Sequence, residues 1–194
     1  MITTQDFLKM KQDHEKITMV TCYDYSSAKL VNDSDIDCIL VGDSLAMVMH
    51  GHPTTVFATT DLMALHTQAV AKGAPNKFIV ADMPFLSYQT SVEDAVKNAG
   101  ILIKDGGAGA VKIEGGTQVS KHTQTLVNYG IPVLGHVGLT PQSFHQLSGY
   151  KIQGKTLEDA QKIIDDANAV EDSGAFAVVL ECIPQELAED ITGR

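Results

Sequence analysis

The sequence has no long hydrophobic run, few basic residues and no hydrophobic segment near its start. No apolar stretch in its 194 residues approaches the roughly 18 residues of a transmembrane helix. The first residues, MITTQDFLKMKQDHEK, lack the apolar core of a secretory signal. The formal net charge of -10 disfavours nucleic acid and anionic membranes as partners. We therefore expect a cytoplasmic protein without nucleic-acid or membrane partners.

Cysteine is also scarce. Cys22, Cys38 and Cys182 lie far apart in the chain, and each sits in an apolar stretch. This placement predicts reduced thiols in the core rather than a disulfide or a metal site.

No linker, low-complexity segment or short internal repeat interrupts the chain, which predicts a single domain over residues 1–194. Apolar, β-branched runs alternate with stretches of helical period. Nearly continuous apolar runs are typical of parallel strands that are buried on both faces. The expected strands are residues 18–23, 38–41, 78–81, 110–113, 132–135 and 177–180.

Helix starts are marked by capping residues and prolines. Ser91 and Thr156 are each followed by apolar residues at every third or fourth position, so each is expected to be an N-cap. Pro141 and Pro184 follow Thr140 and Ile183, where a first helical residue is expected. Repeated strand–helix units predict a parallel sheet with right-handed crossovers.

Two architectures fit such a sheet, an open doubly wound sheet and a closed (β/α)₈ barrel. A dinucleotide-binding sheet concentrates its signal in a glycine-rich turn after the first strand, and the first expected strand is not followed by one. Polar residues instead follow the carboxyl end of every expected strand, as in barrel enzymes. They are Asp24, Asp43, Ser44, Asp82, Lys112, Glu114, His136 and Glu181. This distribution favours the barrel.

Three of these residues are carboxylates from consecutive strands: Asp43, Asp82 and Glu114. Neighbouring strands lie about 4.8 Å apart, so the three groups would converge and repel one another unless a cation lay between them. Oxygen ligands without a Cys or His cluster favour Mg²⁺. The alternative is that each aspartate caps the helix that follows its strand.

Lys112 and Glu114 are two residues apart, so in a strand they point to the same side, here the interior mouth of the barrel. A buried lysine needs an anionic partner, either a substrate carboxylate or Glu114 itself. Glu181 ends an apolar run, which predicts a raised pKa and a general base, or alternatively an internal salt bridge. His136 is a ligand, a hydrogen-bond donor or a core histidine.

Weaker signals have simpler interpretations. The glycine-rich segment 106–109 precedes a strand instead of opening a helix, so a tight connection is expected rather than a phosphate loop. The histidines of segment 50–52 lack further ligands at metal spacing and are expected in a loop. Ser44 is a candidate hydrogen-bond donor to a substrate, and no neighbouring base marks it as a nucleophile.

Seven blocks, in order along the chain, resemble the signatures of one family. They are TCYDYSSAKL, VGDSLAMVMHGH, HTQAVAKGAPNKFIVADMPF, VKIEGG, PVLGHVGLTPQS, GYKIQG and VVLECIP. Together they identify the chain as similar to the ketopantoate hydroxymethyltransferase family. The resemblance implies a barrel of the phosphoenolpyruvate mutase and isocitrate lyase type.

The resemblance also implies an activity. Members transfer a hydroxymethyl group from 5,10-methylenetetrahydrofolate, a co-substrate, to 3-methyl-2-oxobutanoate. The product is 2-dehydropantoate, in the first step of pantothenate and coenzyme A biosynthesis. The reaction proceeds through an enolate stabilised by one Mg²⁺ per subunit, and the enzymes are cytoplasmic homo-oligomers, often decamers.

The family's site residues carry over by motif. The implied metal ligands are Asp43, Asp82 and Glu114. The implied substrate-binding residues are Asp43, Ser44, Asp82, Lys112 and His136. Glu181 resembles the family's proton acceptor.

Two features depart from the family. Ala46 stands where the family usually has the second glycine of GDSLGM. The chain is also shorter than the roughly 250 residues of a barrel, so we expect a barrel truncated after its sixth strand. This leaves two alternatives: an inactive barrel that serves only as an oligomer partner, and a Mg²⁺-dependent 2-oxo acid lyase of the same barrel group. A KKCGH-like catalytic loop, typical of those lyases, is missing from the sequence.

Overall fold

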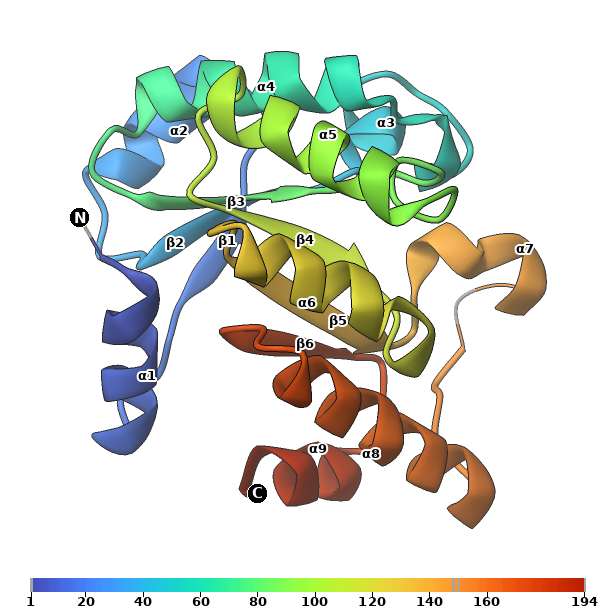
Figure 1. The fold of residues 1–194 in the computed structure, drawn as a ribbon. Coiled ribbons are helices and arrows are strands. Elements are labelled where there is room, and N and C mark those ends of the chain that lie inside the picture. The colour runs from blue at the N-terminus through green and yellow to red at the C-terminus, as the bar shows by residue number, and fades with distance from the viewer. Residues whose placement is uncertain (1, 148, 150, 194) are drawn as a thin grey trace.

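The computed structural model describes residues 2–147, 149 and 151–193, so Tyr150 of the GYKIQG block and the terminal Arg194 lie outside the described residues (Figure 1). Six parallel strands form one sheet in the order β1-β2-β3-β4-β5-β6. Their bounds are β1 Met19–Thr21, β2 Cys38–Val41, β3 Phe78–Asp82, β4 Ala110–Glu114, β5 Val133–Gly138 and β6 Ala177–Glu181. A doubly wound sheet reverses its strand order, whereas a barrel adds each strand beside the previous one. The predicted barrel-type fold is therefore confirmed, as six consecutive strands of a (β/α) barrel.

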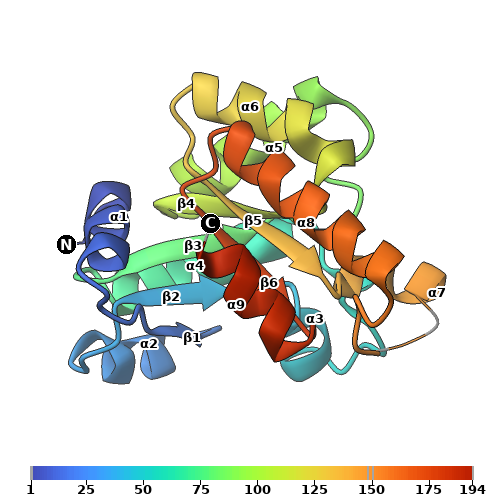
Figure 2. The ribbon, with the colours of Figure 1, turned by 90° about the horizontal axis from the view of Figure 1, so that it is seen from below.

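Helices α2, α4, α5, α6 and α8 follow one another along the outer face of this sheet (Figure 1). Helix α1 lies at the amino ends of the strands, and α7 lies at their carboxyl ends (Figures 1 and 2). The α-helices are α1 Thr4–Gln12, α2 Tyr25–Asn32, α3 Leu45–Val48, α4 Thr60–Gly73, α5 Val92–Lys104, α6 Ser120–Asn128, α7 Phe144–Leu147, α8 Leu157–Asp172 and α9 Gln185–Gly193. The 3₁₀ turns are η1 Thr55–Phe57, η2 Thr117–Val119 and η3 Pro141–Ser143. Within the described residues, no helix is both long and apolar enough to span a bilayer.

The predicted helix starts agree with the structure, with one shift. Ser91 and Thr156 cap α5 and α8: each hydroxyl accepts a hydrogen bond from the backbone N–H three residues later, at 3.0 and 3.1 Å. Pro141 is the first residue of η3, as expected. Pro184 lies one residue before α9 rather than in its first position, and its carbonyl accepts from the N–H of Ala188. Segment 106–109 is the tight connection from α5 to β4, and the 50–52 segment is loop.

The outer face of the sheet is apolar and packs against the helices. Alternate residues of the central strands form this layer with the helices: Ile39, Val41, Ile79, Ala81, Val111 and Ile113. The prediction that the strands are buried on both faces is confirmed for β2 to β5 but wrong for the two outermost strands, β1 and β6. Met19 in β1 is 39% exposed, and every residue of β6 is only partly buried. The reason is position, because each of these strands has a neighbour on one side only in the described sheet.

The inner face changes character along its length. At the amino ends it is apolar, formed by Cys38, Phe78, Val80, Ala110 and Leu134 under Phe7 of α1. At the carboxyl ends the same face carries Asp82, Lys112, Glu114, His136 and Glu181. Strand alternation explains this placement, because residues two apart share a face. The sheet register also places Lys112 opposite Asp82, His136 opposite Glu114, and Glu181 opposite Gly138.

All three cysteines are free thiols, as expected. Cys22 and Cys38 are buried in the core, but Cys182 is exposed, so its predicted core position is wrong. Strand β6 ends at Glu181, and Cys182 has a positive φ of 51°, which turns the chain away from the sheet.

Candidate active site

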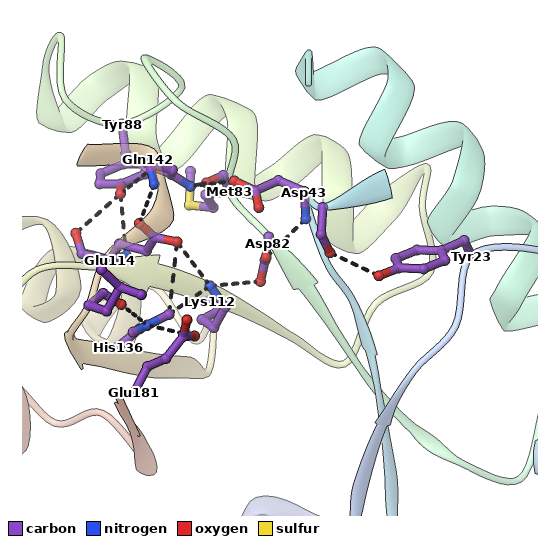
Figure 3. Close-up of polar contacts among 12 residues, drawn as sticks. Tyr23, Asp43, Asp82, Met83, Tyr88, Lys112, Glu114, His136, Gln142 and Glu181 are labelled. Atoms are coloured by element: carbon purple, nitrogen blue, oxygen red, sulfur yellow. Dashed lines mark hydrogen bonds and ion pairs between the residues drawn. The ribbon is translucent and has the colours of Figure 1, made fainter. Parts of the chain in front are cut away.

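Lys112 is the centre of the polar cluster at the carboxyl ends of the strands (Figure 3). Its Nζ lies 3.0 Å from Asp82 Oδ1, 3.7 Å from Glu114 Oε1 and 3.2 Å from His136 Nδ1. All four residues are buried. The prediction that the side chains of Lys112 and Glu114 lie on the same side of their strand is therefore confirmed. The nearest carboxylate, however, is that of Asp82 on the neighbouring strand, whereas the sequence predicted a substrate carboxylate or Glu114 as the anionic partner of Lys112.

The turn after β2 brings Asp43 against Asp82. The backbone N–H of Asp43 donates to Asp82 Oδ2 at 3.0 Å. A Cβ at Gly42 would lie 2.8 Å from Ser44 Oγ, so the glycine leaves room for the hydroxyl of Ser44 beside the same turn. Ser44 Oγ lies 2.9 Å from the Tyr23 hydroxyl, so the candidate substrate donor already has one hydrogen-bond partner.

The alternative that Asp43 and Asp82 cap the helices after their strands is wrong, whereas Asp24, which follows β1, is a helix cap. Asp24 Oδ1 accepts from a backbone N–H in the first turn of α2 at 2.9 Å. Asp43 contacts the site instead, and α5, the helix after β3, is capped by Ser91 rather than Asp82. Ala46, at the family's usual glycine, is fully buried in α3 with its methyl group accommodated.

Gln142 was not predicted as a site residue, yet it contacts two of the candidate ligands. Its Nε2 donates to Asp43 Oδ2 and to the carbonyl of Met83, both at 2.9 Å. Its backbone N–H donates to Glu114 Oε2 at 3.0 Å, and its Oε1 accepts from the Tyr88 hydroxyl at 2.8 Å. The residue lies in the TPQS part of a family block, which was the only signal in the sequence.

Negative charge exceeds positive charge in this cluster. Burial, together with repulsion from Asp82, raises the pKa of Asp43 to about 8. Burial also raises the pKa of Glu114 to about 7, against the opposing effect of Lys112. Burial alone would lower the pKa of Lys112, but the neighbouring carboxylates outweigh it and raise that pKa. Three buried carboxylates thus face one ammonium group, and the site favours a further cation or bound protons.

His136 is a neutral side chain that lies between Lys112 and Glu181. Its Nε2 lies 2.8 Å from the carbonyl of Leu139, an acceptor, so Nε2 carries the proton. Nδ1 is then the atom that accepts from Lys112. Burial, with Lys112 adding to it, lowers the pKa of His136 to about 3, which keeps the ring neutral.

Glu181 is the accessible member of the cluster, with a side chain that is 40% exposed. Its Oε2 lies 3.3 Å from His136 Nε2 (Figure 3). Because that histidine is neutral and its single ring N–H faces the Leu139 carbonyl, this contact is neither a hydrogen bond nor the salt bridge that was the alternative. Burial raises the pKa of Glu181, as the apolar run predicted.

The carboxylates of Asp43, Asp82 and Glu114 lie near one another, but they are not arranged around one common position. Across the described part of the chain, no three His, Cys, Asp or Glu side chains are arranged to hold a metal ion. Asp43 and Asp82 are adjacent, whereas the Lys112 ammonium lies between Asp82 and Glu114. Asp82 Oδ1 accepts no hydrogen bond from a described residue, and its contact is the ion pair with Lys112.

Comparison with solved structures identifies the class of fold. The chain is similar to 2,3-dimethylmalate lyase, described as a PEP mutase/isocitrate lyase superfamily member, with a TM-score of 0.67 at 18% identity, covering 100% of this chain and 67% of that one. A phosphonopyruvate hydrolase, solved with oxalate and Mg²⁺, gives a TM-score of 0.67 at 14% identity, covering 93% and 63%. The fold is therefore that of the PEP mutase/isocitrate lyase barrels.

Sequence comparison identifies the family within that class. Residues 1–194 match the family model described as ketopantoate hydroxymethyltransferase. A 3-methyl-2-oxobutanoate hydroxymethyltransferase of Clostridium botulinum is 55% identical over 190 residues, covering 98% of this chain and 69% of the relative. One from Legionella pneumophila is 55% identical over 188 residues, covering 96% and 71%. The chain belongs to the ketopantoate hydroxymethyltransferase family.

Proposed function

We propose that the chain transfers a hydroxymethyl group from 5,10-methylenetetrahydrofolate to 3-methyl-2-oxobutanoate, which gives 2-dehydropantoate for pantothenate and coenzyme A synthesis. Family membership supports the substrate and product, since the relatives carry this activity in their names. The observation that carries the proposal is the buried acidic cluster around Lys112, with the carboxyl of Glu181 at its accessible side.

One Mg²⁺ per subunit is part of the proposal, with Asp43, Asp82 and Glu114 as its ligands. The donor set fits, because hard carboxylate oxygens suit Mg²⁺. Asp82 Oδ1 has no hydrogen bond from a described residue, and the cluster carries more carboxylates than cations. When bound, Mg²⁺ would polarise the keto group of the substrate and acidify the adjacent C–H.

Lys112 would bind the substrate carboxylate. Its raised pKa keeps it charged, and His136 Nδ1 accepts one of its hydrogens, which restricts the direction of the ammonium group. Ser44 would donate a hydrogen bond to the substrate, with Asp43 and Asp82 beside it. Oriented binding of this kind limits the positions that the reacting carbon can take relative to the base.

Glu181 would remove the proton from C3 of the oxo acid. A raised pKa suits a base that works near neutral pH, and its exposure leaves it open to substrate. The C3 carbanion equivalent then forms a bond to the methylene carbon of the folate. Water supplies the hydroxyl group, and both bonds from that carbon to N5 and N10 of the folate break. The proton taken by Glu181 and the second proton of the water pass to the two nitrogens, which releases tetrahydrofolate.

Other expectations belong to the same proposal. We propose that residues 1–194 form one domain, that the protein works in the cytoplasm without nucleic-acid or membrane partners, and that it forms a homo-oligomer, by family resemblance a decamer. An inactive oligomer partner and a lyase of the same barrel group are the competing outcomes of the test below.

The test separates enolisation from transfer. In D₂O with Mg²⁺ and no folate, NMR should show deuterium exchange at C3 of 3-methyl-2-oxobutanoate, and adding methylenetetrahydrofolate should yield 2-dehydropantoate. Glu181→Gln should lower the exchange rate by about 10²- to 10⁴-fold, because the general base is lost. The matched control, Glu186→Gln on the exposed start of α9, should leave it unchanged.

Each alternative has its own signature in this assay. A folded protein that neither exchanges C3 nor forms product behaves as the inactive partner. Cleavage of a 2-oxo acid or its adduct without folate identifies a lyase. Exchange that persists at the wild-type rate in Glu181→Gln removes Glu181 from its assigned role.

A further inference from the structure

The side-chain amide of Gln142 is hydrogen-bonded on both sides. Its Oε1 accepts from the Tyr88 hydroxyl at 2.8 Å and from Gln89 Nε2 at 3.2 Å. Its Nε2 donates to Asp43 Oδ2 and to the Met83 carbonyl, both at 2.9 Å. Two donors face the oxygen and two acceptors face the nitrogen, so only one orientation of the amide satisfies all four contacts.

Gln142 also joins parts of the site that belong to different strands. It follows β5 in η3, yet it contacts Asp43 after β2, Met83 after β3 and Glu114 at the end of β4. The side chain is buried, so these hydrogen bonds are protected from water. A buried amide with every partner present holds its neighbours firmly, because breaking one contact leaves a polar group unsatisfied.

Each contact to a carboxylate uses one oxygen only. Gln142 donates to Oδ2 of Asp43 through its side chain and to Oε2 of Glu114 through its backbone. The second oxygen of each group is left for other partners, as in the contact of Glu114 Oε1 with Lys112. An arrangement in which an outer residue fixes one oxygen and leaves the other available is typical of residues that orient metal ligands.

We propose that Gln142 is a positioning residue, which holds Asp43 and Glu114 in the orientation that binds Mg²⁺; this rests on the metal site of the proposed function. Tyr88 supports it from the other side, since its hydroxyl contacts both Gln142 Oε1 and the carbonyl of Glu114, the latter at 3.1 Å. Gln142 itself need not touch substrate or metal. Its effect on the reaction is exerted through Asp43 and Glu114.

The test measures Mg²⁺ binding without substrate by isothermal titration calorimetry. Gln142→Leu keeps the approximate volume and the backbone N–H but removes the donors to Asp43 and Met83. We expect its Kd for Mg²⁺ to rise by about 10- to 100-fold, the usual effect of losing a residue that orients metal ligands. The matched control is Gln68→Leu, which breaks a hydrogen bond to the Asp105 carbonyl on the outer helices and should leave the Kd unchanged.

Kinetics provides a second readout. The kcat of Gln142→Leu should recover with increasing Mg²⁺, whereas that of Glu181→Gln should not. If Gln142→Leu does not fold, Tyr88→Phe tests the same amide from its other side, because it removes the hydroxyl that donates to Gln142 Oε1 and that also contacts the backbone of Glu114. We expect it to raise the Kd for Mg²⁺ by about 3- to 10-fold, the usual effect of losing a buried hydrogen bond.

The outcomes distinguish the two proposals. A folded Gln142→Leu protein, or a folded Tyr88→Phe protein in its place, that binds Mg²⁺ as the wild type does overturns the positioning role and leaves the function intact. Wild-type protein that binds no Mg²⁺ at millimolar concentration overturns the metal site, and the positioning role with it. Weaker Mg²⁺ binding, with kcat restored by added Mg²⁺, supports both.

Discussion

The two ends of the inner sheet face differ in chemistry although the same strands form both. At the amino ends, Phe7, Phe78 and Phe176 meet with ring centroids 5.3 to 5.9 Å apart. At the carboxyl ends, β3 and β4 bury Asp82, Lys112 and Glu114. Along β3, Asp82 of the charged layer lies four residues after Phe78 of the aromatic layer.

The difference suggests separate roles for the two ends of the sheet face, one in stability and one in function. Burying an aromatic side chain stabilises the folded state by about 1.5–3 kcal/mol relative to exposure. Burying a charge costs free energy unless partners surround it, and even a well-paired ion pair contributes little net stability. The charged layer is therefore best explained by the proposed function, and the aromatic layer by the stability it gives.

The largest expected effect comes from removing the central cation of the charged layer. Lys112→Met leaves Asp82 and Glu114 buried without their ammonium partner, which should cost about 3–5 kcal/mol of unfolding free energy. Activity should fall as well, because the proposed carboxylate-binding group is lost. Urea unfolding and the C3 exchange assay measure the two effects.

Lys97→Met, on the exposed side of α5, is the matched control and should change neither quantity. An equally stable and active Lys112→Met protein would show that the charged layer does not depend on its cation. The proposal that the carboxyl ends of the strands serve function would then fail at Lys112, the residue on which it depends most.

The next effect tests the aromatic layer alone. Phe7→Ala should cost about 3 kcal/mol in unfolding free energy, because it empties the space between Phe78 and Phe176. The rate of C3 exchange below the melting temperature should stay at the wild-type value, since the site lies at the other end of the strands. Thermal melts and exchange rates at 15 °C measure both.

Leu8→Ala is the control on the same helix. Leu8 is 57% exposed, so its truncation should change stability by less than about 0.5 kcal/mol. A Phe7→Ala protein that loses exchange activity while still folded would show that the two ends are mechanically coupled rather than independent.

The smallest expected effect concerns Asp24, which lies at a strand end but takes no part in the charged layer. Hydrogen bonds from the Ser27 hydroxyl and backbone lower the pKa of Asp24 below its ordinary value of 3.8. A carboxyl with a lowered pKa in the folded state stabilises the protein above its unfolded pKa and loses this contribution as the pH falls. Asp24→Ala should therefore cost about 1 kcal/mol at pH 7, the usual effect of a lost N-cap.

The same reasoning sets the pH dependence. The difference in melting temperature between wild type and Asp24→Ala should be constant above about pH 5 and shrink as the pH falls below about 4. Asp35→Ala, at an exposed position after α2, should show no such difference. If the difference in melting temperature between wild type and Asp24→Ala grew as the pH fell, it would contradict the direction of the pKa shift.

Local sequence patterns predicted most of the fold. Apolar runs gave the six strands within a few residues at each end, and Ser91 and Thr156 were recognisable as caps because capping depends on neighbouring residues. The exposure of β6 and of Cys182 was not predictable in this way. An apolar run does not reveal whether its strand has neighbours on both sides.

The candidate site was predictable where residues alternate along a strand. Lys112 and Glu114 were expected on one side because they are two residues apart, and the structure places them there. Gln142 was missed for two reasons. Its amide does not titrate, and its partner Asp43 is 99 residues away in the chain, so only the folded arrangement brings them together.

The contacts of α1 have a consequence for the order of folding. Each strand pairs with the next one along the chain, so the sheet can grow in steps as the polypeptide is synthesised from its amino terminus. Phe7, however, stacks on Phe176, which immediately precedes β6. Helix α1 therefore completes its docking only after the residues that precede β6 have been synthesised, and until then the ring of Phe7 lacks one of its two aromatic partners.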